Sequence, residues 1–161
     1  VDDDGDGLVD CDDEDCSFDD FDIACALATC PSLELGDATG RGLISTSLDG
    51  AQTDHFQASC SSQNSNDIVV SWEAPVSGCA TFDTFDGTMD TILALFDGCP
   101  DSGGVELACD DDHPGVSAFQ SGFSYDVVAG ESYVIGVDAW SYDIVDTFSL
   151  SIEIEEGSAC E

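Results

Sequence analysis

The acidic excess of this chain constrains its folding more than any other feature. Its 161 residues include 36 aspartates and glutamates but a single basic residue, Arg41, which gives a formal net charge of −35. Charge of one sign at this density opposes a compact state by self-repulsion, and one arginine can relieve little of it. We therefore expect either bound metal cations or a medium of high salt to neutralise the acids.

The type and the clustering of the acids favour metal. There are 27 aspartates and 9 glutamates, and eleven of the aspartates lie in residues 1–22. Short carboxylates in turns supply the oxygen ligands of calcium sites, whereas a surface adapted to salt would use both acids and spread them evenly. The pattern therefore predicts Ca²⁺ as the cofactor.

The same charge limits the partners that the chain can have. Nucleic-acid binding needs a basic surface, which one arginine cannot provide. Anionic membranes would repel the chain, and no apolar run approaches the roughly 18 residues of a spanning helix. The sequence therefore predicts no nucleic-acid partner and no insertion into a membrane.

The cysteines predict disulfides. There are nine, at positions 11, 16, 25, 30, 60, 79, 99, 109 and 160. They lie mostly in polar, turn-like contexts, as disulfides of an oxidising compartment do. The chain contains no CxxC pair of the kind that binds zinc. We therefore predict a secreted, extracellular or cell-surface protein with at least three disulfides within the chain. Because nine is odd, one cysteine is free or bonded to another chain.

Two pairings follow from the predicted strands. Cys99 and Cys109 bracket the turn of a predicted hairpin, and Cys60 and Cys79 flank the strand that contains Trp72. The spacing leaves the partners of the other five cysteines open.

The chain divides into an Asp/Cys-rich segment, 1–32, and a predicted β-sandwich domain, 33–161. Residues 147–155 alternate between apolar and polar side chains, which is the period of a half-buried strand. A short helical turn is expected at 23–30. The other expected strands, separated by Gly- and Pro-containing turns, are 42–48, 54–59, 67–73, 79–85, 91–96, 105–109, 116–127 and 132–138. Strands this short and this regular predict an all-β, jelly-roll-like sandwich.

The first metal motif is the series DxDxDGxxDxxD at residues 2–13. Alternate acids in a tight loop point at one centre, and Gly7 allows the sharp turn that calcium loops need. The order is that of an EF-hand loop, but no helix precedes it, and the series resembles a thrombospondin type 3 calcium repeat. The predicted ligands are Asp2, Asp4, Asp6, the carbonyl of Leu8, Asp10 and Asp13. A second ion in overlapping register would use Asp12, Asp15, Asp19, Asp20 and Asp22.

A second constellation lies in the predicted sandwich. In order along the chain it reads SWEAPVSG at 71–78, MDTIL at 89–93, DGC at 97–99, LACDDD at 107–112 and VAGESYVIGVD at 128–138. This order resembles the bacterial pre-peptidase C-terminal domain family over roughly residues 40–155. The resemblance implies a non-catalytic, secreted β-sandwich module, often attached to a protease. The chain departs from the family pattern at Ala139, where a glycine commonly follows the last aspartate.

The acids of this constellation form a second candidate metal site. Asp90, Asp110 and Asp111, with Asp138 as a further candidate, match acids that recur in that family. Asp90 opens one predicted strand and Asp110 and Asp111 follow another, so adjacent strand ends can bring them together as a calcium site. Turn capping by each aspartate of its own backbone explains the same residues.

Three functions are compatible with these features. The first is a calcium-binding, disulfide-stabilised structural module of an extracellular or cell-surface assembly, which associates with itself or with neighbouring modules. Head-to-tail association would build a filament, with Cys160 bonded to Cys11 of the next copy as one clasp. The second is an accessory domain of a secreted enzyme that binds protein or carbohydrate. The third, a hydrolase using two carboxylates, is disfavoured because neither His55 nor His113 lies in a catalytic motif.

Overall fold

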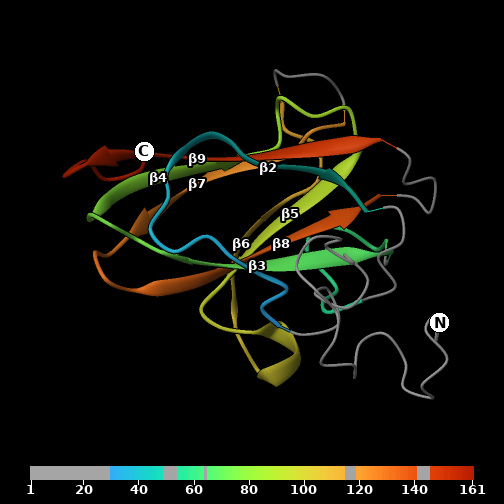
Figure 1. Ribbon diagram of the computed structural model, residues 1–161, viewed down its shortest axis with the longest axis horizontal. Coiled ribbons are helices and arrows are strands. Elements are labelled where there is room, and N and C mark those ends of the chain that lie inside the picture. The colour runs from blue at the N-terminus through green and yellow to red at the C-terminus, as the bar shows by residue number, and fades with distance from the viewer. Residues whose placement is uncertain (1–29, 49–53, 64, 115–118, 141–145) are drawn as a thin grey trace, which may run out of the picture.

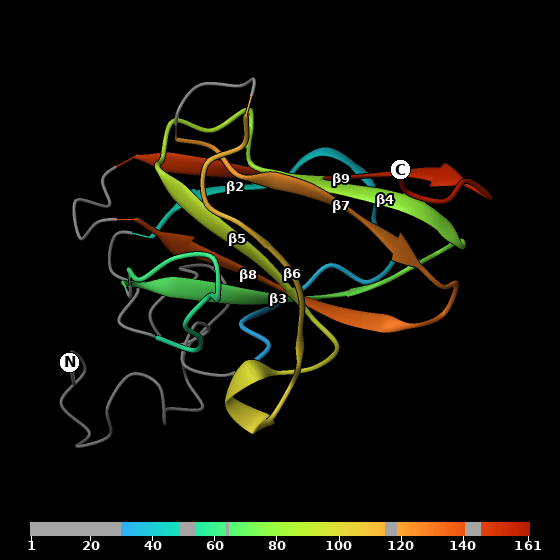
Figure 2. The ribbon, with the colours of Figure 1, turned by 180° about the vertical axis from the view of Figure 1, so that it is seen from behind.

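The structure is a computed structural model that describes residues 30–48, 54–63, 65–114, 119–140 and 146–161. Within these residues it is a sandwich of two sheets, which Figures 1 and 2 show from opposite sides. The single helical element described is a short 3₁₀ turn, η1 (Pro100–Ser102). The predicted all-β, jelly-roll-like sandwich is therefore confirmed.

One sheet has five strands in the order β1-β3-β8-β5-β6. Their bounds are β1 (Leu33–Glu34), β3 (Asp67–Glu73), β5 (Thr91–Phe96), β6 (Glu106–Asp110) and β8 (Ser132–Ala139). The other sheet has four strands in the order β2-β9-β4-β7. These are β2 (Gly40–Ser47), β4 (Gly78–Asp83), β7 (Gly122–Val127) and β9 (Thr147–Glu156). All pairs are antiparallel except the parallel pair of β1 with β3.

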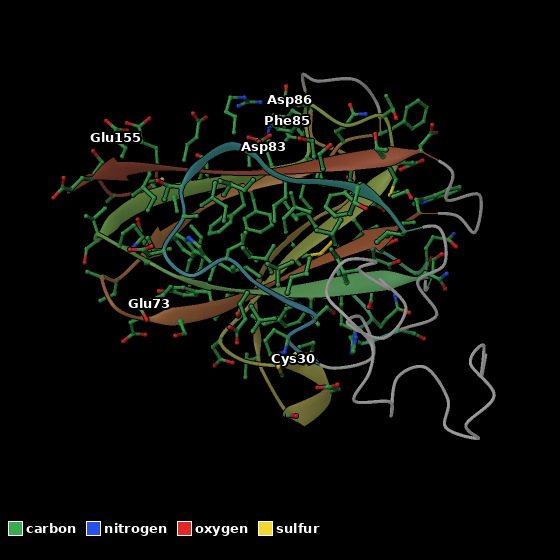
Figure 3. The ribbon with its side chains drawn as sticks, in the orientation of Figure 1. Cys30, Glu73, Asp83, Phe85, Asp86 and Glu155 are labelled. Carbon is green, nitrogen blue, oxygen red and sulfur yellow. A yellow bond between two sulfur atoms is a disulfide. The ribbon has the colours of Figure 1, made fainter. Side chains whose placement is uncertain are left out.

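The main core lies between the two sheets, where the inward side chains of both layers interdigitate (Figure 3). Trp72 of β3 packs edge-to-face on Phe82 of β4, with ring centroids 5.5 Å apart. Its indole N–H donates to the carbonyl of Ala38 at 2.8 Å, so the buried polar atom of this ring is satisfied.

A second core covers the outer face of the five-stranded sheet. Phe56 and Ala58, in the segment 54–63, pack with Val69, Ile92 and other outward apolar residues of that sheet. Strand β5 is consequently buried along its whole length, which explains why its sequence is a continuous apolar run. Figure 2 shows the covering segment lying across β3 and β8.

The predicted strand at 54–59 is wrong, because side chains supply its hydrogen bonds. The carboxylate of Asp67 accepts from the backbone N–H groups of His55 and Phe56, at 2.8 and 3.1 Å. The amide of Gln57 donates to the carbonyls of Ser61 and Gln63. These contacts replace a strand partner and hold the segment as a cover.

The other strand predictions agree with the structure within one or two residues, apart from one. The strand predicted at 116–127 begins at Gly122 in β7, and residues 115–118 lie outside the described part. Strand β1 was not predicted because two residues carry no period. The helical turn predicted at 23–30 also falls almost wholly outside the described residues.

Three disulfides lie in the described part of the chain, which confirms the predicted minimum. They join Cys30 to Cys99, Cys60 to Cys109, and Cys79 to Cys160. Each closes a long loop, with separations of 69, 49 and 81 residues along the sequence. They tie the start of the described chain to the beginning of η1, the covering segment to β6, and the C-terminal end to β4.

The two predicted pairings are wrong. The pair Cys99–Cys109 fails because the hairpin register sets Cys109 opposite Ala94, while Cys99 lies beyond the strand at the start of η1. The pair Cys60–Cys79 fails because β4, which carries Cys79, belongs to the four-stranded sheet, whereas Cys60 covers the other layer. The bond from Cys160 to Cys79 also removes the predicted clasp to Cys11 of a second copy.

Candidate metal site at the end of the five-stranded sheet

Three carboxylates meet where β5 begins and β6 ends. The register sets Leu93 opposite Asp110, so the residues just after β6 lie beside those just before β5. One carboxylate oxygen from each of Asp90, Asp111 and Asp112 falls within 4.8 Å of the others. The sequence prediction that strand ends bring Asp90 and Asp111 together is therefore correct in its geometry.

Partial burial of Asp90 and Asp111, beside the exposed Asp112, disfavours three free anions in this cluster. One oxygen of Asp90 and one of Asp111 are buried without a hydrogen-bond partner. Burial, followed by the charges of Asp112 and Asp111, raises the pKa of Asp90 to about 6. Burial also raises the pKa of Asp111, although a hydrogen bond with Ser61 opposes the shift. A cation held between these oxygens would remove both the desolvation penalty and the repulsion.

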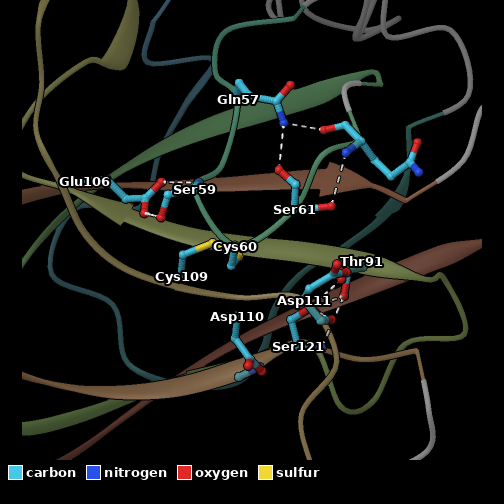
Figure 4. The surroundings of a disulfide bond; sticks show 12 residues. Gln57, Ser59, Cys60, Ser61, Thr91, Glu106, Cys109, Asp110, Asp111 and Ser121 are labelled. Atoms are coloured by element: carbon cyan, nitrogen blue, oxygen red, sulfur yellow. Dashed lines mark hydrogen bonds between the residues drawn. A yellow bond between two sulfur atoms is a disulfide. The ribbon is translucent and has the colours of Figure 1, made fainter.

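Buried hydroxyl groups fix the backbone that carries the cluster. The hydroxyl of Ser121 donates to the carbonyls of Thr91 and Asp111, the latter at 2.7 Å. The hydroxyls of Thr84 and Thr91 lie 2.7 Å apart in the same network. Figure 4 shows Thr91, Ser121 and Asp111 grouped beside the ends of their strands. The two segments that supply the acids are thus tied to each other and to β7.

The covering segment is anchored close to the same place. Cys60 is bonded to Cys109 of β6, and Glu106 of that strand accepts from the backbone N–H of Ser59 at 2.9 Å and from its hydroxyl (Figure 4). This brings Ser61 to Asp111. The disulfide therefore links the cover of the sheet to a residue of the cluster.

Asp110, which the sequence placed among the ligands, is engaged elsewhere. Its carboxylate accepts from the backbone N–H of Gly122 in β7 at 2.9 Å and lies 3.4 Å from the ring of His113. Because β7 belongs to the other sheet, Asp110 points toward the joint between the layers and Asp112 completes the cluster instead. The sequence gives no signal for this exchange, since the chain leaves strand geometry after Asp110.

Asp138 also lies apart from Asp90. It is the cross-strand partner of Asp67, between β3 and β8, and Ile92 of β5 stands opposite it on the other side. The N-terminal candidates Asp2, Asp4, Asp6, Leu8, Asp10 and Asp13, and the overlapping set at 12–22, lie outside the described residues.

Arg41, the single Lys or Arg of the chain, binds acids on the side of the four-stranded sheet. Arg41 of β2 donates two hydrogen bonds to Asp86, at 2.7 and 3.0 Å, and lies 3.4 Å from Glu153 and 3.7 Å from Asp83. Figure 3 shows Asp83 and Asp86 near each other on the side of the four-stranded sheet. Arg41 therefore cannot neutralise the cluster around Asp90.

Two other groups of potential ligands contain disulfide sulfur. Cys30 and Cys99 lie near Asp101, and Cys79 and Cys160 lie near Asp126. Their sulfurs are bonded to each other, so neither group offers a thiolate to a metal.

Comparison with known proteins finds a match only among solved structures. No protein-family model matches the chain, and no curated protein matches it. Among solved structures, the chain is similar to the pre-peptidase C-terminal domain of a collagenase from Bacillus anthracis, solved at 1.0 Å. The match has 11% sequence identity and a TM-score of 0.46, and it covers 74% of this chain and 92% of the other.

Proposed function

We propose that this chain is a non-catalytic, calcium-binding β-sandwich module of an extracellular protein. The observation that carries the proposal is the pair of buried carboxylate oxygens, on Asp90 and Asp111, that have no hydrogen-bond partner and face a third acid, Asp112. All the donors are hard oxygens, which calcium prefers. The N-terminal series DxDxDGxxDxxD would supply further calcium ligands.

An oxidising compartment fits the crosslinks of the sandwich. Three disulfides in one small domain are typical of exported proteins and unusual in a reducing cytosol. No helix in the described part of the chain is long and apolar enough to cross a membrane. From the three disulfides we infer an extracellular or cell-surface location.

The structural role proposed for the module is association with neighbouring modules or with copies of itself. Calcium would lower the repulsion between units that each carry a net charge of −35. Such contacts must form without Cys160, whose sulfur is bonded to Cys79. Light scattering in calcium and in chelator tests the association, and a monodisperse monomer in both would exclude it.

Calcium titration of single variants tests the site. Asp90→Asn and Asp111→Asn each remove one charge from the cluster, and Asp37→Asn removes one from an exposed turn as the matched control. We expect calorimetry to show weaker calcium binding by the first two variants only. Thermal melts should show the same difference between the variants. A ligand that binds only the folded state, at a concentration 100 times its Kd, stabilises that state by about 2.7 kcal/mol. Equal calcium responses in Asp90→Asn and Asp37→Asn would refute the site.

A recognition role is the second candidate, and two exposed aromatic residues favour it. Phe119 and Trp140 are 53% and 44% exposed. The backbone of Trp140 donates to the carbonyl of Asp90, and that of Phe119 accepts from Thr91, so both residues adjoin the acidic cluster. Aromatic faces beside a calcium site suit a carbohydrate ligand.

A panel of immobilised glycans tests this second candidate. We expect binding that requires calcium and that Trp140→Ala abolishes. Val128→Ala, which alters an exposed apolar residue on the turn after β7, should leave binding unchanged. Retained binding by Trp140→Ala, or no binding to any glycan by the wild type, would remove this function.

A further inference from the structure

A second pair of acids is buried more deeply than the first. Asp67 of β3 and Asp138 of β8 are direct cross-strand partners, so their side chains lie on the same face of the five-stranded sheet. Both residues are 0% exposed. The segment that begins at Asp54 covers them, because the backbone N–H groups of His55 and Phe56 bond to one oxygen of Asp67.

Several polar atoms around this pair lack hydrogen-bond partners. Both carboxylate oxygens of Asp138 are buried without a hydrogen-bond partner. The hydroxyl of Ser65 is also buried without a hydrogen-bond partner, and Ser65 is only 5% exposed. Ser65 is a neighbour of the pair, since its backbone N–H lies close enough to Asp138 to lower the pKa of that carboxyl. Ser65, whose hydroxyl has no hydrogen-bond partner, thus lies beside the unpartnered carboxylate of Asp138.

His55 lies close enough to Asp67 to oppose the rise of its pKa, so the uncompensated charge of the pair is that of Asp138. The ion pairs in the described residues leave Asp138 without a cationic partner, and Arg41 is bound to acids of the other sheet. Burial and then the charge of Asp67 raise the pKa of Asp138, and Asp54 adds to the effect. Native proteins seldom leave several buried oxygens unpaired in one place.

We propose that Asp67, Asp138 and Ser65 form a second divalent-cation site, buried between β3 and β8, with Asp54 at its rim. One divalent ion balances the two buried carboxylates, and two oxygens of Asp138, one of Asp67 and the Ser65 hydroxyl supply a hard, all-oxygen donor set of the kind that calcium takes. The site shares no residue with the Asp90 cluster, whose oxygens come from Asp90, Asp111 and Asp112.

A proton shared by the two carboxylates is the competing occupant. It would neutralise one charge but would leave the Ser65 hydroxyl without a function. A cation needs that hydroxyl as a ligand, so the two occupants differ in the consequence of Ser65→Ala.

The experiment is calcium binding by the full chain, measured by calorimetry, in the wild type, Ser65→Ala, Asp138→Asn, Asp90→Asn and the control Asp37→Asn. We expect Asp138→Asn to lose one binding event that Asp90→Asn retains. Ser65→Ala should bind that same ion at least about tenfold more weakly. In chelator, Ser65→Ala should be as stable as the wild type or more stable, because it deletes an unpaired buried hydroxyl.

Each alternative outcome overturns the proposal. Identical calcium binding by Ser65→Ala and the wild type would leave the shared proton as the occupant. Loss of the same binding event in Asp138→Asn and Asp90→Asn would merge the two sites into one. Since the test of the Asp90 site uses different residues, either site can fail alone. If Asp138→Asn does not fold, Ser65→Ala decides the question by itself.

Discussion

Removing the disulfide between Cys79 and Cys160 should cost the protein much of its stability without changing its fold. The bond joins residues 81 apart in sequence. Strand β4, which carries Cys79, is hydrogen-bonded to β7 on one side and to β9 on the other. The sandwich therefore holds β4 in place without the bond, and its contribution lies mainly in restricting the unfolded chain.

The magnitude follows from the length of the closed loop. The chain-entropy model of disulfide stabilisation gives about 4.5 kcal/mol for a loop of this size. The bond between Cys60 and Cys109 already shortens the path between the two residues, so we expect a loss of about 4 kcal/mol. This is a large share of the roughly 5–15 kcal/mol by which most domains are stable.

The assay is guanidinium unfolding of the double variant Cys79→Ser/Cys160→Ser at fixed calcium, against the oxidised wild type. The spectrum of the folded state should be unchanged, and the free energy of unfolding should fall by about 4 kcal/mol. The matched variant Cys60→Ser/Cys109→Ser removes the bond between residues 49 apart in sequence and should lose a similar amount of stability. A loss below about 1 kcal/mol, or a changed native spectrum, would refute the entropic account.

Three further outcomes can be checked by denaturation. Arg41→Gln should lower stability more at low ionic strength than at high, because it removes the one positive charge among exposed acids; equal losses at both would contradict this. Gly136→Ala should lower the free energy of unfolding by about 1–3 kcal/mol, because the added Cβ would lie 2.4 Å from the ring of Phe56. The control Gly98→Ala should lower it less, because the nearest atom to its Cβ is 3.9 Å away. In chelator, the free energy of unfolding should fall as pH rises from about 4 toward 8. Burial raises the pKa of Asp138 to about 8 in the folded state. In this range the unfolded chain therefore loses its proton while the folded chain keeps it, which favours unfolding as pH rises. A rise in stability over the same range would reverse the sign of this argument.

The sequence predicted most strands because their side chains alternate or run apolar for a fixed length. Strand β9 shows the period of two, and β3 and β5 were predicted with their observed bounds. The segment 54–59 defeated the same reasoning. Its apolar residues pack outward onto a sheet face, and its N–H groups bond to the side chain of Asp67 rather than to a strand.

The candidate metal ligands were predictable only where they lie at the ends of strands that are neighbours in the sequence. Asp90 and Asp111 were found because they lie at the ends of two strands that form one hairpin. Asp67 and Asp138 are joined by the pairing of β3 with β8, which are far apart in sequence. No local pattern specifies that register. The pairing Cys60–Cys79 failed for the same reason, since it depends on which layer β4 enters. The pairing Cys99–Cys109 failed because the register of the hairpin sets Cys109 opposite Ala94.

The buried acids are informative because they are costly. Replacing a buried charged group by an apolar one of similar size is often neutral or stabilising. Asp67 holds the covering segment through two backbone N–H groups, but packing gives no such reason to keep Asp138 or the partly buried Asp90 as acids. All three reside at one end of the outer face of the five-stranded sheet, and Arg41, which could relieve them, serves the other sheet. A charged oxygen in such a place is useful when it binds something positive. The concentration of unpaired oxygens at this end of the sheet, in a chain with one arginine and no lysine, therefore argues for cations as components of the folded state.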